Sequence, residues 1–130
     1  MKKFLGIVLL SLLISTKSFA EVYYCIDIDV NGFSEESGNY ERAGYKPIKF
    51  KAKIDFDNGT INSKTIGFES TTQCEKFLSQ KFSLGCSTKW GDYFSIEGNK
   101  ETIKNFDYVR AKVYGRGDSI YVAHGNCEKF

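Results

Sequence analysis

Two aspartates and an asparagine alternate with apolar residues near the start of the chain, in the stretch CIDIDVNG. Asp27, Asp29 and Asn31 stand two residues apart and a glycine follows, which is how a calcium loop of the D-x-D-x-N-G type begins. A helix-loop-helix calcium site also needs a bidentate glutamate at the twelfth loop position, and that position is a glycine here. The alternative of a calcium site therefore stays open only for a non-standard loop, in which Glu35 and Glu36 would be further ligands.

The same spacing is expected of a β-strand with one wet face, because successive side chains of a strand point to opposite sides. A strand over residues 22–31 would place Tyr23, Cys25, Asp27, Asp29 and Asn31 on that wet face. The opposite face is then predicted to be a continuous core stripe of apolar side chains: Val22, Tyr24, Ile26, Ile28 and Val30. Asn31-Gly32 is predicted to be a turn, and the polar residues 34–46 a loop.

Catalytic groups are scarce in this sequence. His124 is the only histidine, and Asp118 and Ser119 lie too far along the same predicted strand to form a triad with it. Asp27 and Asp29 would stand side by side on one strand, whereas glycoside hydrolysis needs two carboxylates across a cleft. We therefore predict that the protein is not an enzyme, and keep a small carboxylate-dependent hydrolase as an alternative.

Aromatic side chains are the other candidates for a binding role. Most are expected to fill the thin core of a small β domain. Trp90, Tyr93 and Phe94 are predicted to line a pocket for an apolar ligand at a barrel mouth. Tyr40 and Tyr45, in the predicted loop, are expected to contact a partner, because tyrosine joins an apolar ring to a polar tip.

Alternating apolar and polar residues predict the strands that position these side chains. The pattern is clearest in IKFKAKIDF, residues 48–56, and Asn58-Gly59 then predicts a tight hairpin turn. Residues 71–82 have apolar side chains at helical spacing and are predicted to form one short helix. The predicted strands are residues 22–31, 48–56, 60–68, 84–90, 92–97, 106–114 and 119–127. This pattern favours a mainly β fold, a single small antiparallel β-barrel or sandwich of about seven to eight strands.

Residues 1–20 have the features of a signal peptide, with Lys2 and Lys3 before an apolar run and small residues up to Ala20. The apolar run, residues 4–14, is about half of the roughly 20 residues that a spanning helix needs, so no membrane span is predicted. We expect cleavage near Ala20, export to the periplasm or beyond, and one domain over residues 21–130. That domain has 18 − 3 = 15 basic residues against 16 acidic ones, which gives no reason to expect nucleic acid as a partner.

All four cysteines lie after the predicted signal, and an even number in a small exported domain predicts two disulfides. Four cysteines can form two disulfides in three different pairings. We favour Cys25 with Cys127, which joins the first and last strands, and Cys74 with Cys86, which closes a local loop. A zinc site is disfavoured because no C-x-x-C pair occurs.

The layout resembles that of small exported bacterial proteins with two cysteine pairs. The resemblance rests on Tyr24-Cys25, on Phe50-x-x-x-Ile54-Asp55-Phe56, and on the run from Gly117 to Phe130 that contains Cys127. The layout is also similar to periplasmic lysozyme inhibitors of the C-type class and to lipocalin-like β-barrels. The inhibitors' Ser-Gly-x-x-Ala-x-Tyr loop and the lipocalins' Gly-x-Trp start have no counterpart here, so no functional residue is transferred.

These features predict an exported, non-catalytic binding or interaction module without a cofactor. Its partner is predicted to be a small apolar molecule or a protein, and the chain is predicted to be a monomer. The resemblance to lysozyme inhibitors implies the main alternative, an inhibitor of a cell-wall hydrolase.

Overall fold

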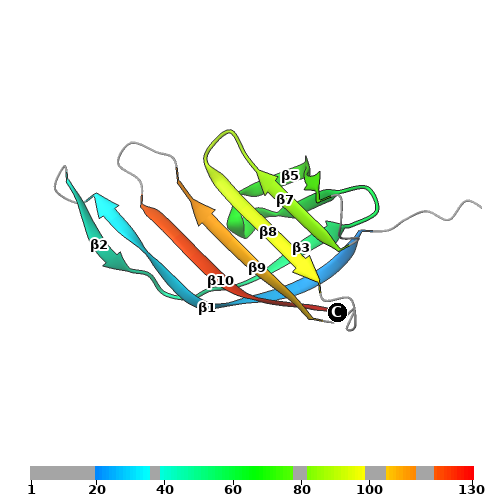
Figure 1. Cartoon of the computed structure of the whole chain (residues 1–130), viewed down its shortest axis with the longest axis horizontal. Coiled ribbons are helices and arrows are strands. Elements are labelled where there is room, and N and C mark those ends of the chain that lie inside the picture. Colours follow the sequence, from blue (N-terminus) through cyan, green and yellow to red (C-terminus); the bar gives the residue numbers. More distant parts are fainter. Residues whose placement is uncertain (1–19, 36–38, 78–81, 99–104, 114–118) are drawn as a thin grey trace, which may run out of the picture.

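The computed structural model describes residues 20–35, 39–77, 82–98, 105–113 and 119–130, which form ten β-strands and one 3-10 helix, η1 (Lys64–Ile66) (Figure 1). The strands are β1 (Glu21–Glu35), β2 (Tyr40–Gly44), β3 (Lys49–Asp55), β4 (Thr60–Ser63), β5 (Phe68–Gln73), β6 (Glu75–Lys76), β7 (Ser83–Ser87), β8 (Asp92–Gly98), β9 (Asn105–Lys112) and β10 (Ile120–Lys129). All belong to one antiparallel sheet of order β5-β4-β3-β1-β10-β9-β8-β7-β6, with β2 paired to β1.

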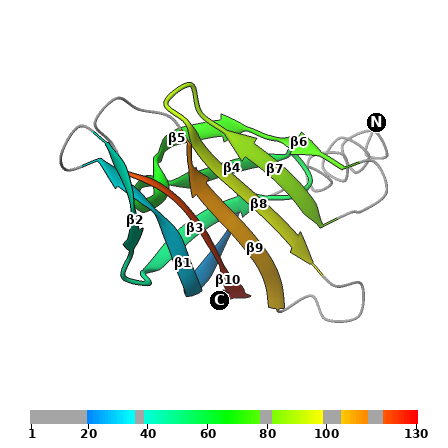
Figure 2. The ribbon, with the colours of Figure 1, turned by 60° about the vertical axis from the view of Figure 1, so that its left-hand side comes forward.

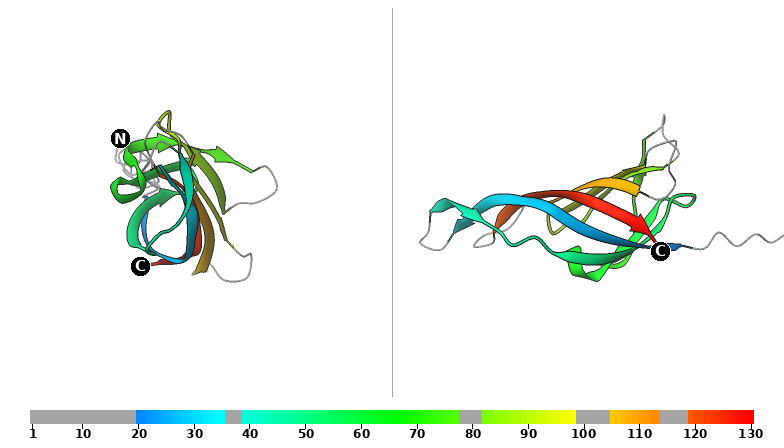
Figure 3. Two further views of the ribbon diagram at one scale, coloured as in Figure 1. Left: turned by 90° about the vertical axis from the view of Figure 1, so that its left-hand side faces the viewer. Right: turned by 90° about the horizontal axis from the view of Figure 1, so that it is seen from below.

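The sheet curls into a nearly closed barrel, which the end-on view in Figure 3 shows. β5 and β6 stand at opposite ends of the strand order, although only Cys74 separates them in the chain. β5 pairs with β4 and β6 pairs with β7, so this one segment connects the two edges of the sheet (Figure 2). The prediction of a mainly β, antiparallel domain is confirmed; of the two predicted architectures, barrel and sandwich, the structure is a nearly closed barrel, with more strands than expected.

Both favoured disulfide pairings are confirmed. Cys25 on β1 and Cys127 on β10 are direct cross-strand partners, and their bond closes a loop with a sequence separation of 102. Cys74 lies between β5 and β6 and is bonded to Cys86 on β7, so the second disulfide fastens the place where the sheet edges meet. Two such bonds are typical of proteins from an oxidising compartment.

The predicted faces of the first strand are inverted up to Asp27, whereas Asp29 and Asn31 are exposed and Val30 is buried as predicted. Tyr23, Cys25 and Asp27 point into the barrel and are buried, whereas Tyr24 and Ile26 are exposed. The pairing of β1 with β10 shifts between Asp27 and Asp29, where Ile28 is an extra residue. Because such a bulge reverses the alternation of a strand, Val30 is the next buried side chain. The predicted core stripe of Val22, Tyr24, Ile26, Ile28 and Val30 is therefore wrong except at Val30.

Three local predictions are also corrected. The helix over residues 71–82 is wrong where the structure describes it, because Thr71–Gln73 belong to β5 and Glu75–Lys76 to β6; residues 78–81 lie outside the described part. β1 continues through Asn31-Gly32, which pair with Val122 and Tyr121 instead of forming a turn. Strand β2 lies within the predicted loop 34–46, since residues 40–44 pair with the end of β1.

The hairpin between β3 and β4 is confirmed. Gly59 has φ of 67°, in the left-handed region that favours glycine. Asp55 accepts hydrogen bonds from the backbone and side-chain nitrogens of Asn58, at 3.0 and 2.8 Å. The sequence therefore encodes this turn locally.

Aromatic rings fill much of the barrel interior. The Tyr23 ring packs edge-on against Phe56 and Phe106, with ring centroids 5.9 and 5.2 Å apart. Phe94 and Tyr108 form a second group with Phe50. In the described residues, no helix has the length and apolarity needed to cross a membrane. The signal peptide predicted for residues 1–20 falls, except for Ala20, outside the described residues.

The two disulfides are expected to contribute unequally to stability. In the chain-entropy model a loop of about 100 residues contributes about 4.7 kcal/mol and one of about 12 residues about 3 kcal/mol. Replacing both Cys25 and Cys127 by alanine should therefore lower the free energy of unfolding more than replacing Cys74 and Cys86. Urea unfolding of both double variants, with circular dichroism as the signal, measures the difference. If the Cys74→Ala/Cys86→Ala variant lost more free energy of unfolding, the bond that joins the sheet edges would stabilise the fold by more than the chain-entropy model assigns to it.

Candidate functional site

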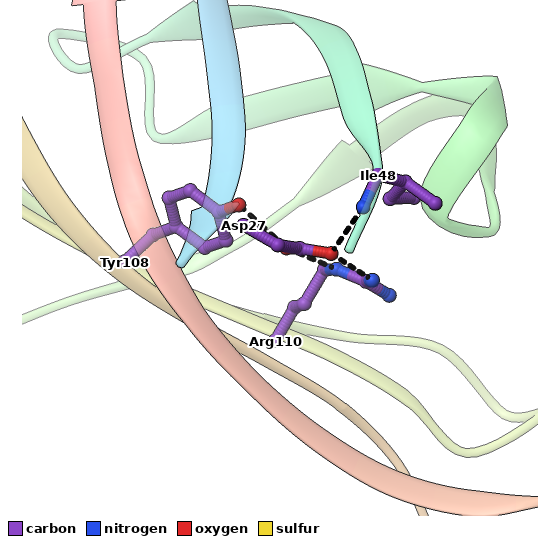
Figure 4. A network of polar contacts seen from close by, with 4 residues as sticks. All are labelled: Asp27, Ile48, Tyr108 and Arg110. Carbon is purple, nitrogen blue, oxygen red and sulfur yellow. Dashed lines mark hydrogen bonds and ion pairs between the residues drawn. The ribbon is translucent and has the colours of Figure 1, made fainter. Parts of the chain in front are cut away.

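A buried carboxylate lies inside the barrel wall, and Figure 4 shows its partners. Asp27 on β1 accepts hydrogen bonds from Tyr108 Oη at 2.6 Å and from Arg110 Nε at 3.0 Å, both on Oδ1. Its Oδ2 accepts from Arg110 Nη2 at 2.5 Å and from the backbone N–H of Ile48 at 3.0 Å. Both carboxylate oxygens are thus satisfied, and the ion pair with Arg110 is bidentate.

The electrostatics of this network follow from burial and pairing. Burial raises the pKa of Asp27, but hydrogen bonds from Arg110, Tyr108 and Ile48 outweigh it, so the pKa lies below its usual value. Burial also raises the pKa of Tyr108, and the Asp27 carboxylate raises it further. For Arg110, burial lowers the pKa, and the contacts with Asp27 reverse that effect. Asp27 is therefore a fixed anion that holds a cation, which is unsuitable for a general acid.

A glycine makes room for this network. Tyr108, Gly125 and Asp27 are neighbours across β9, β10 and β1. A Cβ atom on Gly125 would lie 2.6 Å from Tyr108 Oη and 2.0 Å from the Ile26 carbonyl oxygen. The tyrosine ring passes over the glycine to reach the carboxylate.

The network also contacts rings toward one end of the barrel. The Arg110 guanidinium lies 5.0 Å from the Tyr121 ring centroid and 5.9 Å from that of Phe50. The Tyr121 ring packs against Tyr45, with centroids 5.5 Å apart, and Tyr45 donates to the Phe33 carbonyl at 2.7 Å. Arg110 thereby supports Tyr121, which lines a hollow beside the network.

This hollow, the Trp90 cleft, has a volume of about 800 Å³. It lies between η1 with β5 on one side and the turn from β7 to β8 on the other. Its position follows from the barrel closure, because β6 pairs with β7 and, within the described residues, no pairing continues from β7 to β5. The lining residues are Lys64, Thr65, Ile66, Gly67, Glu69, Ser70, Thr72, Ser87, Thr88, Lys89, Trp90, Asp92, Lys112 and Tyr121.

Trp90 is held outward on an ordered turn. The Thr88 hydroxyl oxygen accepts from the backbone N–H groups of Trp90 and Asp92, at 3.3 and 3.2 Å, and Gly91 takes a positive φ of 84°. The Trp90 side chain is 65% exposed, and the Lys89 ammonium lies 5.0 Å from its ring centroid. Tryptophan is highly buried on average, so a fixed and exposed one is a candidate contact for a ligand.

The structure separates the aromatic residues predicted to form a site. Trp90 lines the cleft, whereas Phe94 is fully buried in the core and Tyr93 is exposed without lining the cleft. Tyr40 lies on β2, and Tyr45 packs on Tyr121 next to the cleft. Sequence reasoning missed Arg110 and Tyr108, and also the three cleft lysines, Lys64, Lys89 and Lys112.

The calcium candidates are likewise not brought together. Asp27 points inward to Arg110, while Asp29 and Asn31 are exposed beyond the bulge and hydrogen-bond to each other at 3.0 Å. Among the described residues, no group of three or more histidine, cysteine, aspartate or glutamate side chains is arranged to hold a metal ion.

Comparison with known proteins gave no matching family model, no matching curated protein and no matching solved structure. Function must therefore be argued from the cleft and the surface of this chain.

Breaking the buried ion pair is expected to destabilise the fold strongly. Asp27→Asn or Arg110→Met should each cost about 3–5 kcal/mol, because either leaves a buried polar group without its partner. The double variant Asp27→Asn/Arg110→Met should lose less than the sum of the single losses. Urea unfolding at neutral pH measures the free energy of unfolding of the three variants. If the loss in the double variant equalled the sum of the two single losses, Asp27 and Arg110 would not be energetically coupled.

The same pair predicts a pH dependence. Because the folded pKa of Asp27 is lowered, its contribution to the free energy of unfolding is full above the ordinary aspartate pKa of about 3.9. The contribution falls as the pH drops through the folded pKa. Unfolding measured from neutral to acid pH should show a steeper acid loss for the wild type than for Asp27→Asn. If the free energy of unfolding fell equally with pH in the wild type and in Asp27→Asn, the acid loss would not come from the Asp27 carboxylate.

Proposed function

We propose that the protein is a non-catalytic binding module whose Trp90 cleft holds a segment of an acidic oligosaccharide. The observation that carries the proposal is a fixed, exposed tryptophan at a large cleft lined by hydroxyl and lysine side chains.

The aromatic part of the cleft supports stacking of a sugar ring. One face of a pyranose ring presents C–H groups, which pack on the flat indole surface. The Thr88 hydrogen bonds hold the turn, so the Trp90 side chain projects from an ordered backbone and the turn itself need not be ordered on binding.

The polar part of the cleft supports recognition of hydroxyl and carboxylate groups. Besides Thr88, whose hydroxyl is already used within the turn, four lining residues carry hydroxyls on short side chains: Thr65, Ser70, Thr72 and Ser87. Lys64, Lys89 and Lys112 outnumber the two acidic lining residues, Glu69 and Asp92, and Asp92 already accepts a hydrogen bond from Thr88 at 3.2 Å. This excess of cations favours an acidic sugar over a neutral one.

This lining argues for a different ligand from the small apolar molecule expected from the sequence. An apolar molecule would cover lysine and hydroxyl groups without replacing their hydrogen bonds to water, which costs free energy. Catalysis gains no support from Asp27, because its carboxylate is buried and fully paired.

Binding of defined oligosaccharides tests the proposal. Trp90 is the only tryptophan of the chain, so its fluorescence reports directly on the cleft. Tetragalacturonic acid should change the emission and bind more tightly than maltotetraose, a neutral sugar of the same length. Trp90→Ala should weaken binding of the acidic sugar by about 2 kcal/mol in calorimetry, as loss of an aromatic anchor does.

Tyr93→Ala is the matched control, because Tyr93 is an exposed aromatic residue on the adjoining strand β8 that does not line the cleft. The affinity of this variant for tetragalacturonic acid should equal that of the wild type. Absence of binding to both sugars at millimolar concentration, or equal affinity in Trp90→Ala, would refute the proposal.

A further inference from the structure

The outer face of β1 carries a largely exposed apolar stripe, in which the Tyr24 ring contacts the Phe130 ring and the Lys51 ammonium, each at 5.3 Å from the Tyr24 ring centroid. Since Tyr23, Cys25 and Asp27 point inward, Tyr24 and Ile26 point outward, and Ile28 joins them at the bulge. Ile26 and Ile28 are 46% and 59% exposed, which is unusual for isoleucine. Beside them a hollow of about 370 Å³ is lined by Tyr24, Ile26, Phe50 and charged neighbours.

Charges of opposite sign flank this stripe. On one side the exposed side chains of β3 are all lysines: Lys49, Lys51 and Lys53. On the other side, acidic side chains are exposed on three successive strands: Glu128 on β10, Asp107 on β9 and Glu97 on β8. The cross-strand pairing aligns Lys51, Tyr24 and Glu128 in one row.

A face with a central apolar stripe and opposite charges on its two flanks is complementary to itself. A two-fold axis running along β1 places the left flank of one copy against the right flank of the other. Lys51 of each copy then faces Glu128 of the other, and the apolar stripes pack between them. In the right-hand view of Figure 3, β1 and β10 run side by side, as their pairing requires, so Glu128 lies on the strand next to the stripe.

We propose that this face, defined by Tyr24, Ile26 and Ile28 with Lys51 and Glu128 at its flanks, is the interface of a symmetric homodimer. The mixed charge favours a second copy over an anionic membrane, which would attract the lysine flank and repel the acidic one. The Trp90 cleft shares no residue with this face, so the proposal is independent of the proposed function.

Charge reversal at Lys51 and Glu128 tests the proposed dimer, because reversing both charges together should restore the dimerisation that either single reversal weakens. Sedimentation equilibrium of the full mature chain should show a concentration-dependent dimer. Lys51→Glu and Glu128→Lys should each raise the dissociation constant about tenfold or more, because each places like charges opposite each other at two equivalent contacts. The double variant Lys51→Glu/Glu128→Lys restores the opposite charges and should dimerise like the wild type.

Lys89→Glu is the matched control, since Lys89 is an exposed lysine outside this face. Its dimerisation should be unchanged, and circular dichroism should show the same fold for every variant, because the replaced side chains are exposed. A wild-type monomer at millimolar concentration would overturn the proposal. Failure of the double variant to recover, or binding of the monomer to phosphatidylglycerol vesicles through this face, would also overturn it.

Discussion

Asp27 and Arg110 form the interaction on which the arrangement of the central strands depends. The pair joins β1 to β9 across β10, and the Ile48 N–H ties the start of β3 to the same carboxylate. A slip of β9 by one residue would turn Arg110 out to solvent and leave the buried Asp27 unpaired. The network therefore fixes a single register for a part of the sheet that is otherwise lined with interchangeable aromatic rings.

The same constraint explains why one side of the chain is apolar toward solvent. Asp27 and Cys25 must face inward to meet Arg110 and Cys127, and the alternation of β1 then turns Tyr24 and Ile26 outward. Apolar character alone would have placed these side chains in the core. A specific polar pair and a covalent bond thus override the hydrophobic preference of the strand, and the exposed stripe is the result.

The sequence predicted the antiparallel β class, the β3–β4 turn and both cysteine pairs, because alternation, Asn-Gly turns and cysteine spacing are local signals, but it did not separate a barrel from a sandwich. It failed for the faces of β1 before the bulge at Ile28, because the apolar side chains of Tyr24 and Ile26 were assigned to the core and the inward demand of Cys25 and Asp27 was not recognised. One signal was available: Phe106, Tyr108 and Arg110 alternate on a predicted strand, so an inward-pointing arginine required an inward-pointing carboxylate. The Trp90 cleft was only partly predictable, because Trp90 stands out, whereas the lysines converge through barrel closure.

The two cross-links are nested, since the bond from Cys74 to Cys86 lies within the segment that Cys25 and Cys127 enclose. A protease that cuts once anywhere between Cys25 and Cys127 therefore leaves two pieces that remain covalently joined through neighbouring strands β1 and β10. A single nick in that segment leaves the protein as one covalent molecule, and the two fragments cannot separate while the bond between Cys25 and Cys127 is intact.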